Sequence, residues 1–147
     1  MTSVGRDLPR AEFAFPGPLR DRLVGAVLTG AKTSTTGLRL QHEREGEPLP
    51  EVGLRSLLVD SDDRGVAVLE TTAVAVVPLG DVDLAHARAE GGGFETVAAW
   101  RSAHDRFFCG PEMRAVLGDP GFTTDDTTLV VLERFRVVDR LGPPVDR

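Results

Sequence analysis

The run of residues 66–77 constrains the fold more than any other stretch, because its side chains can be divided into two regular, alternating sets. One set is Val66, Val68, Glu70, Thr72, Val74 and Val76, and the other is Ala67, Leu69, Thr71, Ala73, Ala75 and Val77. A period of two predicts a β-strand, and a strand that is largely apolar on both faces is buried on both sides. We therefore expect residues 66–77 to form the central strand of a sheet, with Glu70 as an acid in its middle.

The rest of the chain predicts further strands and helices in mixed order. A helix starts at Pro18, carries apolar residues at Leu19, Leu23 and Val27, and ends at Gly30. The other predicted elements are strands at 33–40, 54–59 and 127–138, helices at 84–90 and 94–108, a helical turn at 112–117, a hairpin turn at 61–65 and an exposed loop at 42–51.

This order of elements is typical of an α+β domain. A twelve-residue strand in so short a chain indicates a sheet that curls, so we expect a small mixed β-barrel of about five to six strands with flanking helices. The length of 147 residues fits a single domain spanning 1–147, with a core at about 13–138 and loose termini.

The overall charge limits the kind of ligand. The formal net charge is −6 and the sequence pI is about 5.0. Tight non-specific binding of nucleic acid relies on neutralising many phosphates, which an acidic chain does poorly. A small uncharged ligand fits this charge better, and a local basic groove remains compatible with it.

The cysteine and histidine positions give no sign of a disulfide or a metal site. Cys109 is the single cysteine, and the three histidines, His42, His86 and His104, lie in separate segments without ligand spacing. Residues 1–10 contain no apolar stretch of a secretory signal, and no run reaches the roughly 18 apolar residues of a membrane span. We expect a cytoplasmic protein that binds no metal, cofactor or membrane.

The basic residues are unusual in type. Lys32 is the only lysine among 17 basic residues, and it follows the helix that ends at Gly30. Arginine stays charged in proteins, whereas burial can make a lysine lose its proton and act as a base. The alternative is a surface lysine at a helix C-terminus, where the helix dipole favours any cation.

Three residues could form a hydrolytic site. The Thr35 hydroxyl is a weak nucleophile that needs a base such as Lys32 within reach, and Glu70 in an apolar strand could supply a proton or orient the lysine. The structural alternatives for Glu70 are a solvent-facing position or an ion pair with an arginine. Gly91–Gly93 follows a predicted helix rather than a strand, so it lacks the context of a phosphate-binding loop.

The predicted helix at 94–108 carries two further candidates. Trp100 could stack on a nucleic-acid base, and His104 follows it by one helical turn. Both have a structural alternative as packing residues of an apolar helix face.

Four features in order resemble the ASCH domain family, which belongs to the PUA-like superfamily of small β-barrels. They are the motif G-x-K-x-x-T-x-R at residues 30–37, a Gly-Glu-Pro-Leu-Pro loop within 45–53, a Leu-Glu-Thr-Thr strand at 69–72, and a helix at 99–108. The resemblance covers about residues 13–138. The chain has Gly37 where the motif has its arginine, and Arg39 is the nearby basic residue.

The resemblance implies binding of RNA or nucleoside derivatives in a cleft between barrel and helix. Some similar bacterial proteins are amidohydrolases that remove the acetyl group from N4-acetylcytidine, and in these the motif lysine and threonine and a strand glutamate are implicated in catalysis. By position, these residues correspond to Lys32, Thr35 and Glu70. The further residues expected to contact a ligand are Gly30, Thr33, Arg39, Trp100 and His104.

The sequence thus favours a hydrolase that acts on an N4-acylated cytidine, with Lys32 as base, Thr35 as nucleophile and Glu70 as acid or orienting group. Three alternatives stay open. One is a non-catalytic module that binds single-stranded RNA, in which Lys32 contacts a phosphate and an aromatic side chain stacks on a base. The other two are a ribonuclease and a protein-interaction domain.

Overall fold

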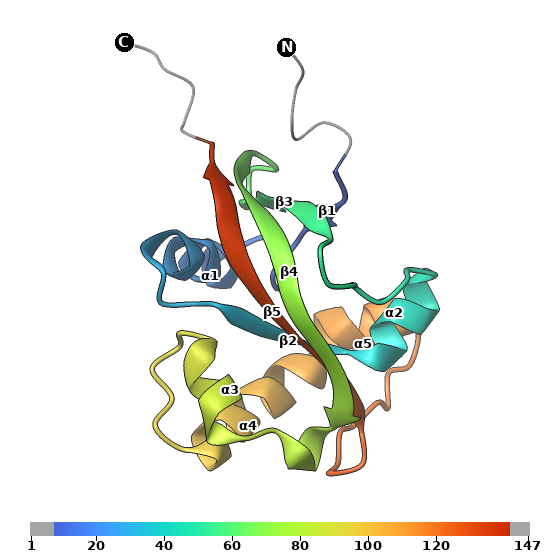
Figure 1. Cartoon of the computed structure of the whole chain (residues 1–147). Coiled ribbons are helices and arrows are strands. Elements are labelled where there is room, and N and C mark those ends of the chain that lie inside the picture. Colours follow the sequence, from blue (N-terminus) through green and yellow to red (C-terminus); the bar gives the residue numbers. More distant parts are fainter. Residues whose placement is uncertain (1–7, 142–147) are drawn as a thin grey trace.

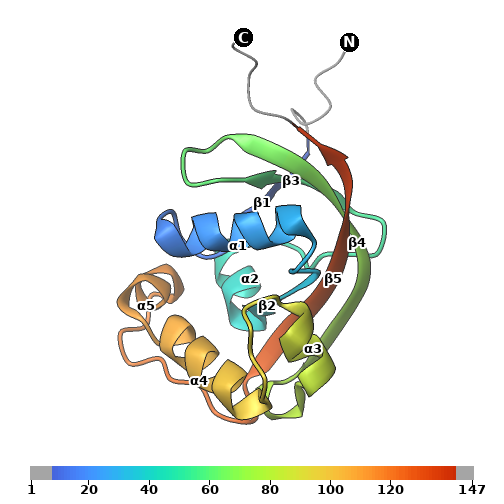
Figure 2. The ribbon, with the colours of Figure 1, turned by 90° about the vertical axis from the view of Figure 1, so that its left-hand side faces the viewer.

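The computed structural model describes residues 8–141, which form one five-stranded sheet with helices packed against it (Figures 1 and 2). The strands lie in the order β1-β3-β4-β5-β2. Their bounds are β1 Arg10–Ala11, β2 Ser34–Leu38, β3 Arg55–Val59, β4 Gly65–Pro78 and β5 Leu129–Arg140. The helices are α1 Pro18–Thr29, α2 Arg39–Glu45, α3 Leu84–Ala89, α4 Val97–Phe108 and α5 Pro111–Leu117, with a short 3-10 helix, η1, at Leu79–Asp81.

The long strand predicted at 66–77 is β4, and it occupies the centre of the sheet. It pairs antiparallel with β3 on one side and β5 on the other. Register shifts between Val68 and Leu69 and between Thr71 and Ala73 interrupt its pairing with β5, and such bulges increase the local twist of a strand. The two long strands curve together, and the helices lie on the concave side (Figure 2).

The sheet does not close into the barrel that the sequence led us to expect. β1 and β2 lie at opposite edges of the strand order, and no pairing joins them. β1 has only two residues, which is too short to complete a ring of strands. The α+β class is correct, whereas the predicted closed barrel is wrong.

Two apolar clusters fill the space under the curved sheet. The first, which contains Val24, Val27, Leu58, Leu69 and Phe135, packs α1 against β3, β4 and β5. The second surrounds Trp100 and Phe108 of α4 and joins α3, α5 and the near ends of β2 and β5; its other buried members are Leu38, Leu79, Val82, Ala87, Met113, Leu117 and Val130. Between α1 and α4 the structure has a cavity, which is described below.

Several predicted boundaries differ from the structure. Residues 39–45, part of which was expected as loop, form α2, which Gly46 ends in the left-handed conformation. Of the termini expected to be loose, Arg10–Ala11 and residues 139–140 are paired in the sheet, and residues 1–7 and 142–147 lie outside the described residues. No helix among the described residues is long and apolar enough to cross a membrane.

Candidate functional site

The junction between α1 and β2 fixes Lys32. Gly30 ends α1 in the left-handed conformation at φ 89°, which glycine adopts without a steric penalty. The Lys32 backbone N–H then donates to the Ala26 carbonyl at 3.0 Å, and the Thr33 N–H donates to the Ala89 carbonyl at 2.7 Å. Gly30 and Thr33, which were expected to contact a ligand, do not line the cavity described below. They hold the backbone around Lys32 instead.

The Lys32 side chain is buried, with 2% of its surface exposed. Its Nζ donates to the Ser34 carbonyl at 2.8 Å and to the Glu90 carbonyl at 3.4 Å, and it lies 3.7 Å from Glu90 Oε1. The amine also lies 5.4 Å from the centre of the Phe13 ring. Burial lowers the pKa of Lys32, and the nearby Glu90 carboxylate opposes this effect only in part. The predicted alternative of a surface lysine is therefore wrong.

Glu90, at the end of α3, is the carboxylate that pairs with Lys32. Its Oε2 accepts a hydrogen bond from the Thr36 hydroxyl, and its Oε1 lies 3.1 Å from His104 Nε2. His86 Nε2 lies 3.4 Å from Oε2. Burial works to raise the pKa of Glu90, but the hydrogen bonds from His104 and His86 and the charge on Lys32 outweigh it, so this pKa lies well below its usual range. Glu90 is ionised.

Gly91 brings the Glu90 loop against Lys32. A Cβ at Gly91 would lie 2.6 Å from the Ala31 carbonyl oxygen and 2.9 Å from the Lys32 Cα, and the residue has φ +77°. Only glycine combines that backbone conformation with so close an approach. The glycine after Glu90 therefore keeps the carboxylate within reach of the amine.

These groups open onto a cavity of about 590 Å³ between α1 and α4. One wall is polar and contains Lys32, Thr35, Thr36, Glu90 and His104. The other walls are mostly apolar, with Arg22 as their one charged side chain among the described residues. They consist of Phe13, Ala14, Leu19, Arg22, Leu23, Ala26, Gly91, Gly92, Phe94, Ala103 and Phe107. A mostly apolar pocket with a few convergent polar groups is the usual form of a small-molecule site.

The two threonines of β2 differ in their contacts. The Thr36 hydroxyl bonds to Glu90 and lies 2.7 Å from His86 Nε2. Thr35 lines the cavity, and within residues 8–141 its hydroxyl has no hydrogen bond that would compete with a base or a ligand.

Glu70 lies elsewhere, on the outer face of the sheet. Its carboxylate accepts a hydrogen bond from Arg136 at 2.8 Å and lies 3.6 Å from Arg55. These arginines are its cross-strand neighbours on β5 and β3. Glu70 does not line the cavity, so the expected grouping of Lys32, Thr35 and Glu70 does not form, and an ion pair with arginines accounts for Glu70.

Two other expected ligand contacts are also absent from the cavity. Trp100 has no exposed surface and belongs to the core, so its face is not available to a nucleic-acid base. Arg39 lies on α2, is exposed and pairs with Glu43. His104 does line the cavity, and its ring stacks on Trp100 with 4.1 Å between the centroids.

The sequence contained one signal for Glu90 that we interpreted otherwise. The acid stands directly before Gly91–Gly93, a run that lacks the context of a phosphate-binding loop. A triple glycine after a helix indicates a close backbone approach as well as mobility. His86 and Thr36, which hold the acid, had no such signal.

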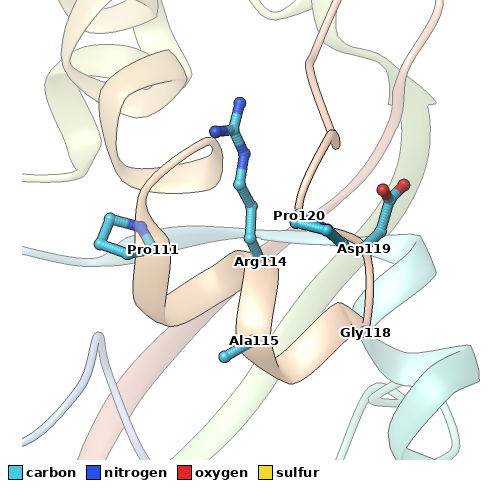
Figure 3. A pocket seen from close by; sticks show the side chains of 6 residues that line it. All are labelled: Pro111, Arg114, Ala115, Gly118, Asp119 and Pro120. Atoms are coloured by element: carbon cyan, nitrogen blue, oxygen red, sulfur yellow. The ribbon is translucent and has the colours of Figure 1, made fainter.

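A hollow of similar size, about 600 Å³, lies at the end of α5 (Figure 3). Pro111, Ala115 and Pro120 contribute to its lining, and its charged side chains are Arg114 and Asp119. Arg114 Nε already donates to the Phe122 carbonyl, and Asp119 accepts from the Gly121 N–H. This hollow pairs no nucleophile with a base. Within residues 8–141 no group of three or more His, Cys, Asp or Glu side chains could hold a metal ion.

Comparison with known proteins identifies the family. The model of the ASCH domain matches residues 12–139. The chain belongs to the ASCH domain family. This membership, together with the ASCH neighbour below, supports the PUA-like α+β fold that the four sequence features together implied.

Two solved structures are similar to this ASCH domain. Protein EF3133 from Enterococcus faecalis V583 has 29% sequence identity and a TM-score of 0.76, with 88% of this chain and 75% of that chain covered. An ASCH domain from Lactobacillus crispatus JV V101 has 25% identity and a TM-score of 0.77, with 93% and 83% covered. A search of curated proteins gives no match.

Proposed function

We propose that this ASCH domain hydrolyses the amide of an N4-acylated cytidine or a similar acylated nucleoside in the cavity between α1 and α4. The observation that carries the proposal is the buried Lys32 amine, whose pKa is lowered by burial and which lines the same cavity as the Thr35 hydroxyl. A lysine of this kind can serve as the base that a threonine nucleophile needs.

The hydrogen bonds of Lys32 suit a neutral amine. A neutral amine has two N–H donors and one lone pair, and two backbone carbonyls, those of Ser34 and Glu90, accept from Nζ. The lone pair is then left for a proton from Thr35. The Glu90 carboxylate, 3.7 Å from Nζ, holds the amine in place and stabilises the cation once the proton has been taken.

The reaction then proceeds in two halves. Lys32 removes the proton of Thr35, the hydroxyl oxygen attacks the amide carbon, and the carbon–nitrogen bond breaks as Lys32 returns the proton to the leaving N4 amine. This leaves cytidine and an acyl ester on Thr35. Lys32 next takes a proton from water, and the water oxygen attacks the ester carbon. The bond from that carbon to the Thr35 oxygen then breaks as Lys32 returns the proton to this oxygen, which releases the carboxylic acid and free Thr35.

The cavity suits a nucleoside better than a polymer. Its volume of about 590 Å³ and its mostly apolar walls, with Phe13, Phe94 and Phe107, fit one base and its acyl group. The net charge of −6 disfavours a long polyanion. The RNA-binding alternative also requires Lys32 to contact a phosphate, and a residue that is only 2% exposed does not favour such a contact.

The test is release of cytidine and acetate from N4-acetylcytidine by the purified protein. Lys32→Met and Lys32→Arg should both lose about 100-fold or more in kcat/KM, because arginine keeps the charge but cannot accept a proton. In Thr35→Ala the acyl-enzyme should not form, which intact mass measures, and Thr35→Ser should retain part of the activity. Cleavage of unmodified RNA by the wild type would favour the ribonuclease, and salt-sensitive RNA binding that survives Lys32→Arg would favour the binding module.

A further inference from the structure

His104 faces a hydrogen-bond acceptor with each of its two ring nitrogens. Its Nδ1 lies 2.9 Å from the Trp100 carbonyl oxygen, and its Nε2 lies 3.1 Å from Glu90 Oε1. A carbonyl oxygen cannot donate, and a neutral imidazole carries only one N–H. If His104 were neutral and Glu90 ionised, one of these two contacts would set a lone pair against a lone pair.

The surroundings of Glu90 favour the proton on His104 rather than on the carboxylate. Thr36 donates to Oε2, and His86 Nε2 and Lys32 Nζ lie 3.4 and 3.7 Å from the two carboxylate oxygens. A carboxylate that accepts several hydrogen bonds stays ionised. Glu90 Oε1 therefore needs a donor from His104, and the doubly protonated imidazolium supplies one while still bonding to Trp100.

Few other charges act on His104. On its own helix, Asp105 is bound by Arg101 and by the Thr124 hydroxyl. The rings of Trp100, Phe94 and Phe108 surround the imidazole at centroid distances of 4.1, 6.1 and 5.8 Å. The remaining groups that face the shared cavity or the shared carboxylate are Arg22 from α1, Lys32 before β2, and His86 from α3.

We propose that His104 is the cationic partner of Glu90 and a positioning residue for Lys32. The proposal rests on the proposed function in one respect, namely that Lys32 acts as a base. The Glu90 carboxylate lies among three basic side chains, Lys32, His86 and His104, and its single negative charge can neutralise only one cation. When His104 holds that charge, Lys32 can lose its proton without leaving Glu90 unpaired.

The charge on His104 thus sets the pH at which Lys32 becomes a base. If His104 is replaced by a neutral residue, the Glu90 anion attracts the Lys32 proton more strongly. The Lys32 amine then stays protonated to a higher pH. The loss of activity should be large near neutral pH and should shrink as the pH is raised, whereas a merely structural role would lower activity by the same factor at every pH.

The charge state can be measured without any activity. Long-range ¹H–¹⁵N spectra of protein labelled on its three histidines distinguish a doubly protonated ring from either neutral tautomer. At about pH 7 we expect an imidazolium pattern for His104, absent in His104→Gln and converted to a neutral pattern in Glu90→Gln. His42→Gln is the matched control, because His42 does not line the cavity, and it should leave the imidazolium pattern in place.

A neutral His104 pattern in the folded wild type would overturn the proposal, even if N4-acetylcytidine is hydrolysed. For the kinetic arm, the acid limb of kcat/KM should move to higher pH by about one unit or more in His104→Gln. The reason is that His104 and Lys32 both face Glu90 Oε1, at 3.1 and 3.7 Å, and removing a charge so close to a titrating group changes its pKa by about that much. A uniform loss without a shift of the limb would also overturn it. If the wild type shows no turnover, the proposed function fails, and the spectra alone decide the charge on His104.

Discussion

The Lys32 amine and the Glu90 carboxylate lie 3.7 Å apart and are both buried, with side-chain exposures of 2% and 7%. The two residues come from distant elements, since Lys32 precedes β2 and Glu90 ends α3. Removing one partner of a buried polar contact typically costs about 1–3 kcal/mol, and more where the group left behind is charged, as Glu90 is. The pair thus links the stability of the fold to the chemistry of the cavity.

A double-mutant cycle should detect this coupling in the free energy of unfolding. We expect Glu90→Gln and Lys32→Met each to destabilise the protein, and the double variant to lose less than their sum by about 1–3 kcal/mol. Urea unfolding at about pH 7 measures all four proteins. Additive losses would show that the amine and the carboxylate do not interact.

The contribution of Glu90 to the stability of the fold should depend on pH. The pKa of Glu90 is below its ordinary value of 4.5 in the folded state, so its stabilisation is fully present above that ordinary value and is lost as the pH falls through the folded pKa. The difference in stability between wild type and Glu90→Gln should therefore shrink as the pH is lowered below about 4.5. A difference that stays constant down to the acid transition would contradict an ionised Glu90.

The rate of hydrolysis should report the state of Lys32. Burial lowers the pKa of Lys32 from 10.5, and the neutral amine is the active form, so kcat/KM should rise with pH and level off below that ordinary value. A pH–rate profile with N4-acetylcytidine measures the limb. A rate that is independent of pH, or that falls as the pH rises through this range, would remove Lys32 as the base.

Gly91 and Gly93 offer a matched pair of substitutions. Both have positive φ, at +77° and +79°, but a Cβ would meet the Ala31 carbonyl only at Gly91, while Gly93 has open space. Gly93→Ala should cost about 1 kcal/mol from backbone conformation alone. Gly91→Ala should cost more and should also lower kcat/KM, because the loop must move away from Lys32. Equal losses in both variants would show that the close approach is unimportant.

Glu133 should be a site where substitution stabilises. This β5 residue accepts a hydrogen bond from the Thr71 hydroxyl at 2.6 Å, and burial raises its pKa above the ordinary value of 4.5. A carboxyl group whose pKa is raised in the folded state makes the fold less stable as the pH rises through that pKa. Glu133→Gln keeps an acceptor for Thr71, so it should raise the Tm at about pH 8 and have little effect at about pH 4. A lower Tm at both pH values would contradict this.

The sequence predicted most of the helices and strands, and of the site it predicted Lys32 but not its acid partner. The period of two in residues 66–77 and the Gly30 helix end correctly placed β4 and α1, because local patterns of burial and turn chemistry carry that information. The sequence also singled out Lys32 as a buried amine candidate, and the structure buries it.

The acid partner of Lys32 could not be found by the same reasoning. Glu70 was chosen because an acid in a long apolar strand should need a cation, and it does pair with cations, the arginines of neighbouring strands. Whether β4 turns that side chain inward or outward depends on its register with β3 and β5, which a single strand pattern does not specify. Glu90 reaches Lys32 through the packing of α3 against β2, a contact between segments 58 residues apart.

The barrel prediction failed for a related reason. Strand length indicates curvature, and the sheet does curve around α1 (Figure 2). Closure requires two long edge strands in register. The edge strand β1 has only two residues, and the sequence around Arg10 gave no sign of it.

The most direct test compares two glutamates in the hydrolysis of N4-acetylcytidine. Wild-type protein should release cytidine, Glu90→Gln should lose about 100-fold or more in kcat/KM, and Glu70→Gln should stay within about twofold of the wild type. Glu70→Gln is the matched control because it makes the same change in a carboxylate that pairs with arginines outside the cavity. Activity that depends on Glu70 and not on Glu90, or the absence of cytidine release by the wild type, would contradict the account.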